Sequence, residues 1–100
     1  MTANAARPEI DGCTVVHLAR GVRLREDTVR NQTVLLAPER AIALDEIAVA
    51  IIKEIDGHRN LDRIADDLSR RFEAPKEQVL QDIIAFIREF LNRRTLEIVG

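Results

Sequence analysis

The chain has 100 residues, of which 46% are hydrophobic and 32% are charged, and its formal net charge is −2. This length and composition predict one small globular domain with its own core. The near-neutral charge disfavours a protein that binds nucleic acid through many phosphate contacts, because that class has a strong basic excess. Cys13 is the only cysteine, so no disulfide can form within the chain, and we expect a reducing, cytoplasmic location. No apolar run is long enough to cross a bilayer, and the first dozen residues lack the apolar stretch of a signal peptide.

The N-terminal residues are small and polar, and they include Pro8 and Gly12. This pattern predicts a flexible tail over residues 1–14. The rest of the chain, residues 15–100, shows no internal boundary, repeat or low-complexity tract, and we expect it to form a single domain.

Three strands are predicted between residues 22 and 44. Val22–Arg25 alternates apolar and basic residues, as a half-solvated strand does. Thr33–Ala37 is the next strand, and Pro38-Glu39 ends it in a turn because proline cannot continue a ladder. Arg40–Leu44 follows as a third strand. If this strand lies at the edge of the sheet, its free N–H and C=O groups are open to an incoming peptide.

Helical periodicity begins immediately after the third strand. The first predicted helix runs from an N-cap at Asp45 to about Ile55, the second from a cap at Asn60 to the Glu-Ala pair before Pro75, and the third from Pro75 to about Asn92. The fold class is therefore α+β: a three-stranded antiparallel β-meander followed by a three-helix bundle, in winged-helix-like order.

The third helix has an unusually wide apolar face. Two adjacent stripes make up this face: Val79, Ile83, Phe86 and Phe90, and beside them Leu80, Ile84, Ile87 and Leu91. Together they cover roughly 160° of the helix, whereas a surface helix needs about 100° to reach its core. One stripe is expected to pack on the first two helices. The other meets the sheet or lines a groove, and the helical wheel does not decide which.

Several segments, in order and with consistent spacing, resemble the PqqD family of pyrroloquinoline quinone (PQQ) biosynthesis. These segments are Leu18–Leu24, Val34–Arg40 (Val-Leu-Leu-Ala-Pro-Glu-Arg), Leu44-Asp45, Asp56-Gly57 and Asp82. The resemblance extends from His17 to Leu91. It departs from the family after the third helix, where a glycine is usual and this chain has Asn92-Arg93-Arg94-Thr95. Asparagine tolerates the left-handed conformation, so a helix cap is still expected there.

The resemblance implies a non-catalytic peptide chaperone, a recognition element for ribosomally made peptides that are later modified (RiPPs). Such proteins bind the precursor peptide PqqA and present it to the radical S-adenosylmethionine (SAM) enzyme PqqE. Related domains take the leader peptide as an added strand on the third strand, against the third helix. Carried onto this sequence, the peptide-binding residues are Arg40, Ala41, Ile42, Ala43 and Leu44 of the strand and Lys76, Val79, Ile83 and Phe86 of the helix. We expect the small side chains of Ala41 and Ala43 to leave room for peptide side chains against the third helix, and Arg40 and Lys76 to pair with acidic residues of the peptide.

Three arginines outside the helices, Arg20, Arg23 and Arg30, have two interpretations. They form either the solvated face of the first strand and its turn or a docking surface for the partner enzyme. The oligomeric state is open between a monomer and a dimer formed by strand edges or domain swapping.

Two other functions compete with PqqA binding. The protein is either a recognition element for a different modified peptide or a winged-helix protein that binds DNA. The exposed arc of the third helix disfavours DNA because it contains the carboxylates of Glu77, Asp82 and Glu89. We expect no metal, cofactor or catalytic set, because Cys13 and His17 are not joined by a second cysteine or by a His-Glu pair at a zinc spacing.

Overall fold

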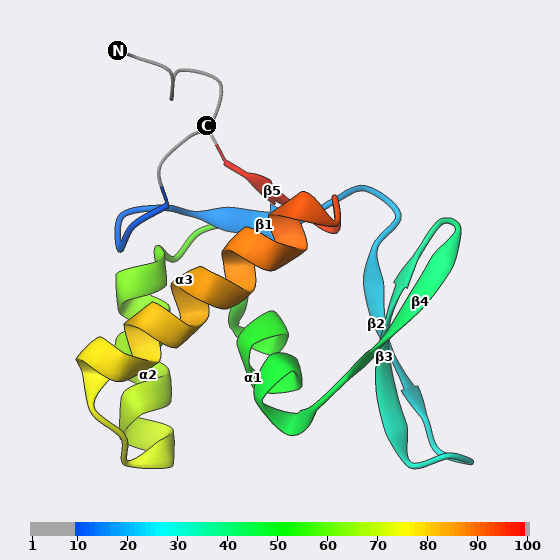
Figure 1. Cartoon of the computed structure of the whole chain (residues 1–100), viewed down its shortest axis with the longest axis horizontal. Coiled ribbons are helices and arrows are strands. Elements are labelled where there is room, and N and C mark those ends of the chain that lie inside the picture. Colours follow the sequence, from blue (N-terminus) through cyan, green and yellow to red (C-terminus); the bar gives the residue numbers. More distant parts are fainter. Residues whose placement is uncertain (1–9, 100) are drawn as a thin grey trace.

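The computed structural model describes residues 10–99 of the chain. Its elements are, in order, β1 (Val16–Leu18), β2 (Arg23–Asp27), β3 (Gln32–Ala37), β4 (Arg40–Leu44), α1 (Glu46–Glu54), α2 (Leu61–Phe72), α3 (Lys76–Asn92) and β5 (Leu96–Ile98). The β2–β4 sheet stands beside the helices, and α1 follows directly from its last strand (Figure 1). The predicted class, an antiparallel meander followed by three helices, is confirmed.

The meander has the strand order β2-β3-β4, and both of its pairings are antiparallel. Only Pro38 and Glu39 separate the closing pair Ala37 and Arg40 of the β3–β4 hairpin. In a hairpin with a two-residue turn, the two residues that flank the turn direct their N–H and C=O groups toward each other and bond across the hairpin. Bonded and non-bonded pairs then alternate along the ladder. The N–H and C=O groups of Ala41 and Ala43 are therefore directed away from β3, toward the outer edge of β4.

The two faces of this sheet differ in character. Leu35 is completely buried, and its cross-strand partners Leu24 and Ile42 pack against the same core. The opposite face carries Arg23 and Arg25 on β2, Val34 and Leu36 on β3, and Ala41 and Ala43 on β4.

A second sheet, which the sequence did not predict, joins the two ends of the domain. β1 pairs antiparallel with β5, and Val16 lies opposite Ile98. The ladder is extended by the Val99 N–H, which donates to the carbonyl of Val15 at 2.8 Å. Each strand has three residues, too few for an alternation pattern to be recognised.

Residues 10–14 are attached to the domain. The Asp11 side chain accepts a hydrogen bond from the Cys13 N–H at 2.8 Å, and the Gly12 and Thr14 carbonyls accept from Asp62 and Leu61 at the start of α2. The part of the predicted tail within the described residues is thus bonded to α2. Residues 1–9 of that prediction lie outside the described range.

The predicted N-caps of α1 and α2 are confirmed. Asp45 Oδ1 accepts from the Ala48 N–H at 2.7 Å, and Asn60 Oδ1 accepts from the Arg63 N–H at 2.8 Å. Each bond satisfies a donor that the first helical turn leaves free. Between residues 10 and 99, no helix combines the length and the apolar character that a bilayer crossing requires.

The end of α3 differs from the expected cap at Asn92. The left-handed residue is Arg94, at φ 62°. Its N–H donates to the Leu91 carbonyl at 2.9 Å, and the Thr95 N–H donates to the Phe90 carbonyl at 3.1 Å. These two bonds form a Schellman motif, in which glycine is the usual left-handed residue.

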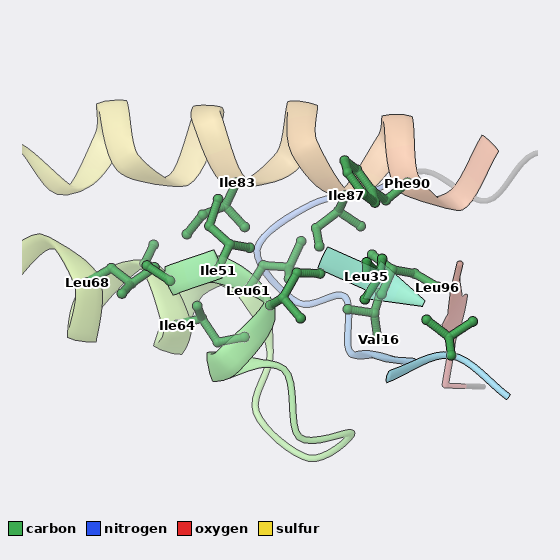
Figure 2. Close-up of a cluster of buried hydrophobic side chains, with 14 residues drawn as sticks. Val16, Leu35, Ile51, Leu61, Ile64, Leu68, Ile83, Ile87, Phe90 and Leu96 are labelled. Atoms are coloured by element: carbon green, nitrogen blue, oxygen red, sulfur yellow. The ribbon is translucent and has the colours of Figure 1, made fainter. Parts of the chain in front are cut away.

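The main core lies between the three helices and the inner face of β3. Figure 2 shows Ile83 and Ile87 directed from α3 toward Ile51 of α1 and Leu61 of α2, with Leu35 at the sheet end of the cluster. One of the two expected stripes of α3 is therefore split, because Ile83 and Phe90 are buried while Val79 and Phe86 are only partly buried. This split leaves the latter two side chains accessible beside the core.

Candidate functional site

The outer edge of β4 is the feature on which the site is built. β4 is the last strand of its sheet, and no strand among residues 10–99 pairs with its other side. The outward N–H and C=O groups of Ala41 and Ala43 are therefore available to a further strand. β2 forms the opposite edge of the same sheet, so an open edge alone does not distinguish the site.

A hollow of about 360 Å³ lies between β4, the start of α1 and α3. We call it the strand groove. Its lining residues are Ile42, Ala43, Leu44, Asp45, Ile47, Ala48, Ile51, Asp82, Phe86, Glu89, Phe90 and Arg93. The Phe86 ring stacks on the largely buried Phe90 ring with centroids 4.2 Å apart, so this part of the groove wall is held by the core. The groove therefore supplies side-chain contacts alongside the backbone edge of β4.

The orientation of β4 corrects one expectation. Ile42 and Leu44 face the helices, and both pack against the core. Ala41 and Ala43 project their side chains onto the opposite face of the sheet, where both are exposed. The alternation was predicted correctly, but the choice of face was reversed. The apolar side chains thus line the groove, and the alanines contribute backbone groups to the edge.

A second hollow of about 150 Å³ adjoins the strand groove on the side of α2. We call it the helix hollow. Its lining residues are Ile47, Ala50, Ile51, Leu68, Phe72, Ala74, Val79, Asp82 and Ile83. It contains two of the predicted peptide-binding residues, Val79 at its side and Ile83 at its floor, where Ile83 is 1% exposed. The predicted helix residues are thus divided, with Phe86 in the groove and these two in the hollow.

Lys76 lies in neither cavity. Its Nζ is 3.2 Å from a carboxylate oxygen of Asp62 on α2, and it marks the first residue of α3. The structure therefore pairs Lys76 with α2, and Lys76 lines neither the strand groove nor the helix hollow.

The charges along the strand groove are uneven. At the hairpin end, Arg40 donates to the backbone carbonyl of Arg93, and Arg40, Arg93 and Arg94 all line a shallow hollow beside Pro38. Arg93 is also paired with Glu89 at 2.7 Å. At the α1 end stands Asp82, which accepts from Gln78 Nε2 at 3.0 Å and has no ion pair with any described residue. The groove is thus basic at one end and acidic at the other.

Several groove residues escaped prediction from sequence. On α3 they are Asp82, Glu89 and Arg93, and on α1 they are Ile47 and Ile51. The α3 residues lie with Phe86 at positions 82, 86, 89 and 93, a spacing that places them along one helical face. This spacing could have been recognised in the sequence, but the charged residues on that helical face suggested a surface in contact with solvent.

The three arginines considered for enzyme docking lie outside both cavities. Arg23 is exposed on the outer face of β2, next to Arg25 on the same face. Arg20 is exposed in the turn before β2. Arg30 lies in the β2–β3 turn, where its Nε is 4.0 Å from Asp27. The structure does not gather the three into one cluster.

Reactive side chains do not converge on either cavity. Cys13 is exposed in the turn before β1, and His17 Nε2 lies 3.6 Å from Glu97 across the β1–β5 sheet. Among residues 10–99, no group of His, Cys, Asp or Glu side chains is arranged to hold a metal ion. The chemistry of the site is therefore that of a binding surface made of backbone donors and acceptors, apolar walls and separated charges.

The strongest ionic cluster lies away from the site, in the α1–α2 loop. Arg59 contacts Glu54, Asp56 and Asp67 at 2.8–3.0 Å. The backbone N–H groups of Arg59 and His58 both donate to Asp56 Oδ1, and together with the Arg59 guanidinium they hold the pKa of the Asp56 carboxyl well below its usual range. In return, the hydrogen bonds to Asp56 and Glu54 raise the pKa of Arg59. The cluster joins the end of α1 to α2.

Comparisons of the sequence with known proteins agree on one family. The profile of Coenzyme PQQ synthesis protein D (PqqD) matches residues 32–96. The PqqA binding protein of Rhizobium meliloti (strain 1021) is 61% identical over 99 residues, which is 99% of each chain. The bifunctional coenzyme PQQ synthesis protein C/D of Methylorubrum extorquens is 42% identical over 95% of this chain, which corresponds to 26% of that larger protein.

Solved structures share the fold. The solution structure of the PqqD truncation of Methylobacterium extorquens PqqCD, a stand-alone RiPP recognition element, has a TM-score of 0.79 at 42% identity and covers 89% of this chain and 95% of that one. TbiB1, solved in complex with the TbiA(beta) leader peptide, has a TM-score of 0.69 at 19% identity over 81% of this chain and 94% of its own. At that identity, TbiB1 shows the fold alone. The profile match, the identity to curated relatives and the shared fold establish that this chain belongs to the PqqD family.

Proposed function

We propose that this protein is a non-catalytic recognition element that binds the precursor peptide PqqA as an added strand on the edge of β4. Its relative in Rhizobium meliloti is named for binding PqqA. A protein of the same fold is solved with a leader peptide. Strand addition draws affinity from main-chain hydrogen bonds, and it draws specificity from pockets for alternate side chains.

The observation that carries the proposal is the coincidence of the open β4 edge with the strand groove. Ala41 and Ala43 each direct about one N–H donor and one C=O acceptor outward, so this edge can form up to about four backbone hydrogen bonds with a peptide. Beside them, Ile42, Leu44 and Phe86 offer apolar surface to every second side chain of the added strand. Near the β2 edge, the hollow at residues 26–33 is lined by turn and strand residues and by no helix residue.

The test replaces one outward donor. Ala43→Pro removes the N–H of Ala43 at the edge while leaving the inward bonds of β4 to β3 in place. We expect the affinity for synthetic PqqA to fall by about tenfold or more, since a lost hydrogen bond and the loss of a close backbone approach together amount to about 1.5 kcal/mol or more. Isothermal titration calorimetry measures the change.

The matched control is Ala43→Val, which keeps the N–H and adds its bulk on the outer face. It should bind PqqA within about twofold of the unaltered protein. Amide spectra of β2 and β3 show whether the hairpin is intact in both variants. Equal affinity of the Pro and Val variants, with the hairpin intact, would rule out strand addition at this edge.

We further propose that the bound peptide is presented to the cytoplasmic radical SAM enzyme PqqE. An added strand continues the β2–β4 sheet, so half of its side chains would emerge on the outer face beside Ala41 and Ala43. Arg23 and Arg25 stand on that face, exposed and without an ion pair among residues 10–99. We therefore assign enzyme docking to this outer face, with Arg25 joining Arg23. Arg20 and Arg30 lie in the turns before and after β2.

A further inference from the structure

The helix hollow has the features of a side-chain pocket. Its floor is formed by Ile51, Leu68 and Ile83, which are all nearly fully buried, and Figure 2 shows them meeting between the three helices. Two large apolar side chains flank it in exposed positions: Ile47 is 57% exposed and Phe72 is 45% exposed. Exposed apolar side chains around an apolar hollow indicate a surface that a ligand covers.

The hollow adjoins the strand groove. Ile47, Ile51 and Asp82 line both cavities. The groove follows α3 from Arg93 to Asp82, and the hollow continues along the same helix to Val79. Asp82 and Val79 are separated by about 4–5 Å along the helix axis at 1.5 Å per residue. An extended peptide covers that distance in one or two residues at about 3.3 Å each.

We propose that the helix hollow is a subsite for one bulky apolar side chain of the bound peptide, placed one or two residues beyond the residue that lies opposite Leu44. The inference rests on the proposed strand addition and extends it past the end of β4. The volume of about 150 Å³ suits one branched aliphatic or aromatic side chain. The β4 strand has five residues, so the recognised segment spans about six or seven residues in total.

We call the peptide residue that fills the helix hollow the anchor residue. The carboxylates near the hollow restrict which residues can stand next to it in the peptide. Asp82 stands at the junction of the two cavities with only the neutral Gln78 amide as a described partner. Asp45, at the start of α1, adds a second carboxylate on the groove side. The junction therefore disfavours an acidic residue next to the anchor, and it admits a neutral or basic one. Acidic peptide residues fit the opposite end, where Arg40 and Arg94 lie.

Phe72→Ser is the discriminating variant because Phe72 lines the helix hollow and is absent from the strand groove. Its exposed position at the last residue of α2 allows the domain to keep its fold. We expect the affinity for synthetic PqqA to fall about five- to fiftyfold, the equivalent of losing much of one buried apolar contact. Val29→Ser is the matched control, since Val29 is a 94% exposed apolar residue in the β2–β3 turn. It should bind within about twofold of the unaltered protein.

The peptide side provides a second measurement that does not depend on a protein variant. Each apolar residue of PqqA is replaced by alanine in turn, and one replacement should reproduce the loss caused by Phe72→Ser. Combining that peptide with Phe72→Ser should cost little more than either change alone, since both remove the same contact. The methyl resonances of Val79 and Ile83 should shift with unaltered PqqA and remain in place with the alanine peptide.

The outcomes separate this inference from the function on which it rests. If Phe72→Ser binds PqqA normally while Ala43→Pro loses binding, strand addition stands and the anchor subsite is refuted. Additive losses in the double-mutant cycle, or unshifted Val79 and Ile83 methyl groups, would refute it equally. If the unaltered protein does not bind PqqA at all, both the proposed function and the subsite fail.

Discussion

At the scale of single residues, two helix ends depend on non-glycine residues in the left-handed conformation. Glu73 ends α2 at φ 52°, and Arg94 follows α3 at φ 62°. A side chain in this region costs of order 1 kcal/mol because its Cβ crowds the backbone. Neither glutamate nor arginine favours the left-handed conformation, so only the neighbouring sequence predicts that the helices end at these residues.

Glu73→Gly should therefore stabilise the domain by about 0.5–1 kcal/mol, because glycine adopts φ > 0 without this strain. Chemical denaturation followed by circular dichroism measures the free energy of unfolding. Glu77→Gly is the matched control: Glu77 lies in the first turn of α3, where the same replacement should destabilise by up to about 1 kcal/mol. Loss of stability in Glu73→Gly would contradict the strain argument.

The Asp56 carboxylate makes the free energy of unfolding of the domain depend on pH. Its pKa in the folded chain is held low by the N–H groups of Arg59 and His58 and by the Arg59 side chain, whereas an unfolded aspartate titrates near pH 3.9. Below that pH the unfolded chain takes up the proton more readily. The stabilisation is therefore present in full above about pH 4, and it is lost as the pH falls further.

Asp56→Asn should remove this part of the acid sensitivity. We expect the variant to be less stable than the unaltered protein at pH 7, with a difference that shrinks steadily as the pH falls below about 4. Urea denaturation at a series of pH values follows both proteins. A difference in stability that stays constant across that range would show that the Asp56 charge does not contribute.

At the scale of elements, the sequence predicted what local patterns encode. The meander, its Pro38 turn and the caps at Asp45 and Asn60 all follow from alternation and capping chemistry, and all are present. The β1–β5 sheet was missed because its strands are short and lie about 80 positions apart. The face of β4 was reversed because the pattern Ala-Ile-Ala-Leu fixes which residues alternate, and only packing decides which pair turns inward.

The candidate site illustrates the same limit. Phe86 was predicted and lines the groove, whereas Lys76 was predicted and pairs with Asp62 instead. Asp82 and Glu89 were interpreted as solvated charges, and Arg93 was interpreted as part of the helix end. Their position beside β4 depends on how α3 crosses the sheet, which no local pattern specifies. Periodicity therefore identified the right helix, and tertiary packing selected the residues.

At the scale of the whole molecule, the two faces of the β2–β4 sheet have different surroundings. The inner face and its edge adjoin the groove and the helices, while the outer face points away from the helices (Figure 1). A peptide added at β4 would lie between these two surfaces. With the peptide and enzyme sites proposed above, the protein would hold a peptide and contact an enzyme at the same time.

Charge reversal of the outer face tests that separation of roles. The double variant Arg23→Glu with Arg25→Glu should bind PqqA within about twofold of the unaltered protein. Its affinity for PqqE in the presence of PqqA should fall about tenfold or more at low salt, and the difference should narrow as salt is added. Arg88→Glu with Arg63→Glu, on exposed helix positions, is the control. An equal loss of enzyme binding in both double variants would reject the assigned docking face.

Amide hydrogen exchange on the β4 edge tests the central claim most directly. The Ala41 and Ala43 N–H groups point outward in the free protein, and strand addition would place them in hydrogen bonds with PqqA. With saturating PqqA, we predict strongly slowed exchange at Ala41 and Ala43. Exchange at Leu24 and Glu26, which the same alternation directs toward the β2 edge, should be unchanged. Tight PqqA binding without added protection at Ala41 and Ala43, or with protection at the β2 edge instead, would contradict the account.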